Sequence, residues 1–181
     1  FDLDGTLLNS LEDLAASTNY ALRRHGYPEH ELPAYRYFVG NGIDKLLERA
    51  LPESVRTHEN VMKIKEDFVA YYAVHKADFT APYAGIPELL GELKKQRMLL
   101  AVASNKYHEA TVVLIPEYFG EGLFDFVFGQ REDVPIKPDP TIVFDIIKAA
   151  GVRKEEVLYV GDSGVDMQTA VNSGVTSVGV T

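Results

Sequence analysis

The chain has 181 residues, of which 46% are hydrophobic and 25% charged, and its formal net charge is −9. This composition is typical of a globular protein with a sizeable core, and a negative chain without a basic stripe is not expected to bind nucleic acid. No apolar run or signal pattern indicates a membrane or secreted protein, and the absence of cysteine excludes disulfides and thiolate metal sites, so we expect a cytoplasmic protein.

The first part of the chain starts with a short apolar run and then changes to helical patterns. Residues 1–3 are fewer than the about five of a usual strand, so we expect this strand, like the final run GVTSVGVT, to be cut. Ser10 and Asp13 resemble a capping box. Apolar residues at helical spacing predict three helices, over residues 10–26, 42–51 and 59–76. Because no buried-strand signal lies between them, residues 10–80 are predicted to be a small helical insert.

Beyond the insert, helices and strands alternate. Helices are predicted over 85–96, about 107–115, 139–151 and 163–174, and strands over 98–104, 124–129, 156–162 and the tail. One helix is well marked, because Asp139 can cap it, Pro140 suits its first position and Gly151 its end. The alternation predicts a parallel sheet with helices on both faces, formed by residues 1–9 and 81–181.

Polar side chains follow the predicted strands at the point where each one ends. Asp2 and Asp4 lie at the end of the first strand, Ser104 ends the next, and Asp162 ends a third. In such sheets the ligand site lies beyond the carboxyl ends of the strands, so we expect these groups to converge. Asp166 lies about one helical turn after Asp162 and can face the same side.

Each group also has an ordinary structural explanation. Asp4 with Gly5 is a common turn dipeptide, Ser104 and Asp162 can be helix caps, and Lys137 can be a solvated lysine. Taken together, these explanations require four polar groups to gather by accident, with carboxylates close enough to repel one another. A cation explains the whole set, and oxygen ligands are those that magnesium prefers.

Four segments resemble, in order and spacing, the motifs of the haloacid dehalogenase-like hydrolase superfamily. They are FDLDGTL, VASN, KPDP and GDSGVDMQTA, and the match runs over nearly the whole chain. The helical insert and the VGNGI and VASNK segments look like the phosphoglycolate phosphatase-like branch. The resemblance implies a Rossmann-like α/β core and a small all-α cap inserted after the first strand.

The resemblance also implies catalytic and metal-binding roles. Asp2 would be the nucleophile, and Asp4 would be the general acid that later becomes the base. Magnesium would be held by Asp2, the backbone carbonyl of Asp4, and Asp162, while Asp166 would support the metal through water or position its loop. Lys137 would hold Asp2 and meet the charge of the transferring phosphoryl group.

The same resemblance implies that further residues bind the substrate. They are Ser104, Asn105 and Gly5 near the phosphoryl group, and Asn41 in the VGNGI turn. In the resembling branch such a turn faces the active site and helps to set specificity. A plain turn between two helices remains the alternative for Asn41.

The sequence thus indicates a magnesium-dependent phosphatase for a small phosphorylated metabolite, with phosphoglycolate the first candidate, acting as a monomer or homodimer. An inorganic pyrophosphatase and a sugar-phosphate mutase of the same superfamily remain alternatives. A dehalogenase is disfavoured, because that branch does not normally carry an acid at the position of Asp4. A non-catalytic regulatory protein phosphorylated at Asp2 would be expected to lack a motif residue, and Asp2, Asp4, Lys137 and Asp162 are all present.

Overall fold

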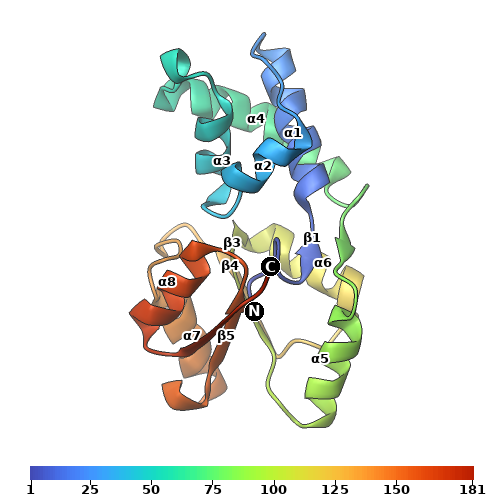
Figure 1. The fold of residues 1–181 in the computed structure, drawn as a ribbon, viewed down its shortest axis with the longest axis vertical. Helices are drawn as coiled ribbons and strands as arrows, with labels where there is room; N and C mark the ends of the chain where they lie inside the picture. The colour runs from blue at the N-terminus through green and yellow to red at the C-terminus, as the bar shows by residue number, and fades with distance from the viewer. The chain divides into compact units, whose positions relative to one another are not determined.

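The computed structural model describes the whole chain, Phe1–Thr181, which forms two compact units (Figure 1). The units comprise residues 1–8 with 82–181, and residues 9–81. Two short strands, β1 (Leu8–Asn9) and β2 (Ala81–Pro82), pair where the chain passes from one unit to the other. None of the helices combines the length and the apolar character needed to cross a bilayer.

The smaller unit is built of helices alone. They are α1 (Leu11–Arg24), α2 (Leu32–Phe38), α3 (Gly42–Ala50), the short 3-10 helix η1 (Glu53–Val55) and α4 (His58–His75). The three helices predicted from apolar spacing are confirmed as α1, α3 and α4. The seven-residue α2 was not predicted, because a helix of two turns shows too few repeats of the period. Its buried Tyr35 packs into a core with Leu22, Leu47 and Phe68.

Asp13 does not form the predicted capping box. Ser10 lies at the start of α1 but its side chain makes no capping bond. The buried carboxylate of Asp13 instead accepts hydrogen bonds from the backbone N–H groups of Phe79 and Thr80, at 3.0 and 2.8 Å, and from the Thr80 hydroxyl at 2.6 Å. This carboxylate therefore ties the first helix of the unit to the segment that closes it.

The larger unit alternates helices and strands, as predicted. Its elements are α5 (Ile86–Lys95), β3 (Ala101–Tyr107), α6 (His108–Phe119), β4 (Phe126–Gln130), α7 (Thr141–Ala150), η2 (Lys154–Glu156), β5 (Leu158–Gly161), α8 (Gly164–Ser173) and β6 (Thr176–Gly179). The cap of α7 differs from the prediction, because Pro140 precedes the helix. Asp139 accepts a hydrogen bond from the Thr141 N–H at 2.9 Å, and α7 begins at Thr141, one residue later than predicted.

The start of the chain joins two pairs of parallel strands. Strand β3 pairs with β4, and β5 pairs with β6. Phe1 exchanges backbone hydrogen bonds with Ala101 and Ala103 of β3, and the Asp2 N–H donates to the Val160 carbonyl of β5 at 2.8 Å. The strand order is therefore β4–β3–(1–2)–β5–β6, and Asp2 lies in the middle of it.

Helices cover both faces of this sheet, as predicted. Alternate residues of a strand point to opposite faces, and Val102 and Ala103 of β3 accordingly enter different clusters. Val102 packs with Leu90 of α5 and Ile115 of α6, whereas Ala103 packs with residues of α7 and α8. Figure 1 shows the two helix pairs on either side of the strands.

Removing the Asp13 carboxylate is expected to destabilise the helical unit strongly. Asp13→Ala would leave the buried donors of Thr80 and the partly buried N–H of Phe79 without an acceptor, which we expect to lower the free energy of unfolding by about 3 kcal/mol. Urea unfolding followed by circular dichroism measures the change. Thr80→Val removes only the hydroxyl and should cost about 1 kcal/mol. Equal effects of the two variants would contradict the assignment.

Candidate active site

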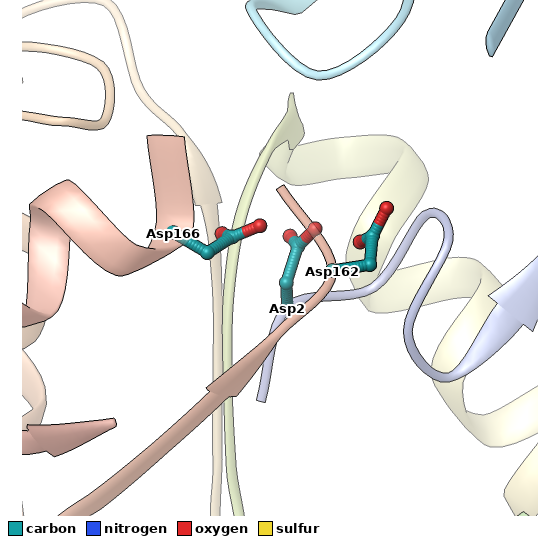
Figure 2. Close-up of side chains that lie close together, drawn as sticks. All are labelled: Asp2, Asp162 and Asp166. Atoms are coloured by element: carbon teal, nitrogen blue, oxygen red, sulfur yellow. The ribbon is translucent and has the colours of Figure 1, made fainter. Parts of the chain in front are cut away.

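Three carboxylates meet at one end of the parallel strands (Figure 2). Asp2 comes from the segment between β3 and β5, Asp162 follows the end of β5, and Asp166 lies in the first turn of α8. One oxygen from each lies within 4.8 Å of the others. Asp2 and Asp166 are buried, whereas Asp162 is exposed. The structure thus brings together three of the four carboxylates that their positions in the sequence predicted to be close, Asp2, Asp162 and Asp166.

Lys137 places a buried ammonium between two of these carboxylates. Its Nζ lies 2.7 Å from Oδ1 of Asp2 and 2.7 Å from Oδ1 of Asp166, and its side chain is 2% exposed. A third contact, at 3.0 Å, joins Nζ to the Tyr159 hydroxyl. Burial alone would lower the pKa of Lys137, but the neighbouring Asp2, Tyr159 and Asp166 raise it, so the side chain remains charged. Lys137 is therefore a fixed part of the site and not a solvated surface lysine.

The carboxylate of Asp166 is saturated with hydrogen bonds from the chain. Oδ1 accepts from Lys137 Nζ and from the Tyr159 hydroxyl at 3.1 Å, and Oδ2 accepts from the N–H and the hydroxyl of Ser163. Burial raises its pKa, but Lys137 and Ser163 outweigh burial and hold it below the usual range. A carboxylate offers about four acceptor sites, so Asp166 is suited to orienting Lys137 and the loop before α8.

The pKa of Asp2 is shifted in the opposite direction to that of Asp166. Burial and the nearby Asp166 raise its pKa to about 6, although Lys137 opposes the change. Only Oδ1 is bonded to Lys137, which leaves Oδ2 for another partner. Partial desolvation by its neighbours also raises the pKa of Asp162, and the Thr6 hydroxyl donates to its Oδ1 at 2.9 Å. Both carboxylates would be stabilised in their charged form by a nearby cation.

These residues fit a divalent metal ion. Three carboxylates lie together and the ammonium of Lys137 contacts two of them, which leaves net negative charge where the oxygens converge. A set of oxygen donors with room for water is the environment that magnesium prefers. Because Asp166 is occupied by chain donors, Asp2 and Asp162 are the side chains suited to direct coordination.

Asn105 fixes the loop that carries Lys137. Its Oδ1 accepts from the Lys137 N–H at 2.8 Å, and its Nδ2 donates to the Lys137 carbonyl at 3.2 Å. The side chain thus bonds both backbone groups of one residue, and the peptide bond that follows, to Pro138, is cis. The position of the Lys137 ammonium therefore depends on Asn105, whose predicted contact with substrate stays a prediction.

Ser104 lies within β3, where regular pairing with β4 is interrupted between Ala103 and Tyr107. The residue that caps α6 is Tyr107, so Ser104 is not a helix cap. Its buried hydroxyl oxygen accepts from the Lys106 N–H at 3.1 Å, which leaves the hydroxyl proton to be donated elsewhere. Asp162 is likewise not the cap of α8, because Ser163 takes that position.

Gly5 allows the backbone to pass directly against Asp162. Its φ is +92°, and a Cβ added there would lie 2.5 to 2.8 Å from the carboxyl atoms of Asp162. Only glycine suits both conditions. The Gly5 turn therefore brings Thr6 to Asp162 in addition to reversing the chain.

Asn41 lies in the helical unit, in the turn before α3. Its Oδ1 accepts from the Arg49 guanidinium at 2.8 Å, and Arg49 also donates to the Phe38 carbonyl at 3.0 Å. The turn is therefore held in place from within its own unit. A role of Asn41 in substrate binding stays a prediction.

Three residues that contact the site were not predicted from the sequence. Lys106 binds Asp4, Tyr159 bonds Lys137 and Asp166, and Ser163 bonds Asp166. A signal was present for two of them. Tyr159 places a hydroxyl in the otherwise apolar strand EVLYVGD, and Lys106 directly follows the polar pair Ser-Asn.

An apolar pocket elsewhere in the larger unit is distinct from this cluster. It is lined by Phe1, Leu99, Leu158 and neighbouring apolar residues at the start of β3 and β5. The carboxylates follow the other ends of these strands. The carboxylates are therefore not part of the lining of the apolar pocket.

Comparison with known proteins is consistent with the geometry. A family model described as haloacid dehalogenase-like hydrolase matches residues 1–180. A phosphoglycolate phosphatase of Mannheimia succiniciproducens is 35% identical over all of this chain and 84% of the relative, and one of Pseudomonas syringae pv. tomato is 36% identical over 98% of this chain and 66% of the relative. The solved structure of a protein assigned as a phosphoglycolate phosphatase, from Lactobacillus delbrueckii subsp. bulgaricus, has a TM-score of 0.94 at 33% identity, covering 99% of this chain and 83% of that one.

Gly5→Ala is expected to displace Asp162 and to weaken magnesium binding by about tenfold or more, the usual effect of disturbing a ligand's support. Isothermal titration with magnesium measures the change. Gly120→Ala is the matched control, because its φ is +82° but its Cβ would meet open space. Similar losses in the two variants would show that backbone strain, and not the approach to Asp162, is responsible.

Magnesium affinity is expected to depend on pH through Asp2. Its pKa of about 6 lies above the usual value, so below pH 6 a proton must leave before the metal binds. Affinity should therefore rise about tenfold per pH unit up to about pH 6 and then level off.

Titrations with magnesium at several pH values between 5 and 8 would measure this dependence. Asp2→Asn should bind weakly at every pH, whereas the exposed Glu121→Gln should follow the parent protein. A flat profile in the parent protein would contradict the role of Asp2 as a ligand.

Proposed function

Because the chain belongs to the haloacid dehalogenase-like hydrolases, we propose that it is a magnesium-dependent phosphatase for small phosphomonoesters. One observation carries the proposal: Asp2 is buried with one oxygen fixed on Lys137 and the other available to attack. The similar proteins named phosphoglycolate phosphatase support phosphoglycolate, or a small ester like it, as the substrate.

The first step would transfer the phosphoryl group to Asp2. Its free oxygen attacks phosphorus, the bond from phosphorus to the ester oxygen breaks, and the leaving oxygen takes a proton from Asp4. The products are an aspartyl-phosphate and the free alcohol. The bond between Lys137 and Oδ1 of Asp2 restricts rotation of the nucleophile, which lowers the entropic cost of reaching the attacking geometry.

The second step would hydrolyse the aspartyl-phosphate. Asp4, now a carboxylate, takes a proton from a water molecule, and the resulting hydroxide attacks phosphorus. The bond between phosphorus and the Asp2 oxygen breaks, which releases inorganic phosphate and restores both carboxyl groups. A switchable acid and base near a fixed nucleophile is the requirement for such a two-step reaction.

Charge on the transferring group would be met from several sides. The Ser104 hydroxyl can donate to a phosphoryl oxygen, and the Lys137 ammonium provides fixed positive charge. Magnesium held by Asp2 and Asp162 would supply further positive charge to the phosphoryl oxygens. Asp166 and Tyr159 would act indirectly, because they hold the ammonium in place.

Phosphate release from a panel of small esters and pyrophosphate, with magnesium or with a chelator, tests the proposal. We expect magnesium-dependent release, with phosphoglycolate among the best substrates. Asp2→Asn should lower the rate by at least about 10⁴-fold, because it removes the nucleophile. Preference for pyrophosphate, or phosphoryl transfer within a sugar phosphate, would instead favour a pyrophosphatase or a mutase.

Asp139→Asn is a suitable control, since Asp139 contacts Thr141 outside the carboxylate cluster. This variant should keep nearly the parent activity. No phosphate release from any ester by the folded, magnesium-bound protein would overturn the proposal.

A further inference from the structure

The carboxylate of Asp4 forms an ion pair with Lys106. Nζ of Lys106 lies 3.0 and 3.2 Å from the two oxygens of the Asp4 carboxylate. The Lys106 side chain is 4% exposed and that of Asp4 is 15% exposed. Because both carboxylate oxygens bond to one ammonium, rotation of the Asp4 carboxyl group is restricted.

The backbone of Lys106 is fixed by contacts on more than one side. Its N–H donates to the Ser104 hydroxyl oxygen at 3.1 Å, and its carbonyl oxygen lies against Gly129 of β4, where an added Cβ would come within 2.6 Å. The side chain therefore extends from a rigid base. Burying such a long side chain costs conformational entropy, and the ion pair with Asp4 offsets this cost.

The two carboxylates of the DLD segment, Asp2 and Asp4, contact different lysines. Lys137 contacts Asp2 and Asp166, whereas Lys106 contacts Asp4. Two neighbouring groups of like charge are thus oriented separately. This separation suits two groups with different tasks, one of which attacks while the other transfers a proton.

We propose that Lys106 is a positioning residue that orients the Asp4 carboxyl group toward the leaving oxygen. The inference rests on the proposed phosphatase function, in which Asp4 protonates that oxygen. Lys106 acts through Asp4, so its contribution depends on how much the leaving group needs a proton. An alkyl oxygen is strongly basic and needs protonation, whereas 4-nitrophenolate leaves without it.

The test compares kcat/KM for an alkyl phosphate and for 4-nitrophenyl phosphate, since this ratio reports the steps up to formation of the aspartyl-phosphate. Lys106→Met is expected to lower kcat/KM about 100-fold for the alkyl ester and less than about 10-fold for the aryl ester. Asp4→Asn should show the same selectivity. Adding Lys106→Met to Asp4→Asn should then lower kcat/KM for the alkyl ester less than threefold further, because the two residues act as a unit.

Lys94→Met is the matched control. Lys94 also contacts both oxygens of one carboxylate, that of Asp125, at 2.9 and 2.8 Å, outside the site. Its loss should affect both esters equally and little. If Lys106→Met does not fold, Lys106→Gln keeps most of the side-chain stem and a hydrogen-bond donor without the charge and gives the same comparison.

Equal losses for the two esters would indicate that Lys106 binds the phosphoryl group directly, and additive losses in the double variant would indicate an independent role. Either result would overturn the proposal, as would unchanged kcat/KM for both esters. Failure of the phosphatase function itself is distinguishable, because the parent protein would then release no phosphate.

Discussion

The site depends on one buried ammonium between two buried carboxylates. Lys137 is 2% exposed and lies 2.7 Å from both Asp2 and Asp166. None of these groups would be stable alone in such surroundings, because an unpaired buried charge costs several kcal/mol. The pair of contacts joins segments that are far apart in the sequence, and it fixes the orientation of the Asp2 carboxylate.

Several surrounding residues hold Lys137 and Asp166 in the positions that this contact requires. Asn105 bonds both backbone groups of Lys137, and Ser163 occupies the oxygen of Asp166 that Lys137 does not contact. Gly161 permits the close approach of Asp166, since a Cβ there would lie 2.4 Å from the Asp166 Cβ. Asn105 and Asp166, which were expected to touch substrate or metal, thus hold Lys137 beside the Asp2 carboxylate.

The alternation of helices and strands could be predicted because it depends on local periodicity and on residues such as Gly151 and Gly174, which end α7 and α8 with positive φ. The convergence of Asp2, Asp162 and Asp166 followed from the position of the first two at strand ends and of Asp166 one helical turn after Asp162. The contacts of Lys106, Asn105 and Tyr159 could not be predicted in the same way. Their partners are set by the register between strands. The spacing of residues along the chain does not determine which of the two lysines, Lys106 or Lys137, contacts which carboxylate.

In the proposed reaction, Asp2 carries the phosphoryl group during turnover. Asp4→Asn should still be phosphorylated by 4-nitrophenyl phosphate, which needs no acid, but should hydrolyse the intermediate slowly. Intact mass measurement of this variant after an acid quench, followed by borohydride reduction and peptide mapping, locates the group. We expect one added phosphoryl group and conversion of Asp2 to homoserine. Turnover without any phosphorylated protein, or a phosphoryl group on another residue, would contradict it.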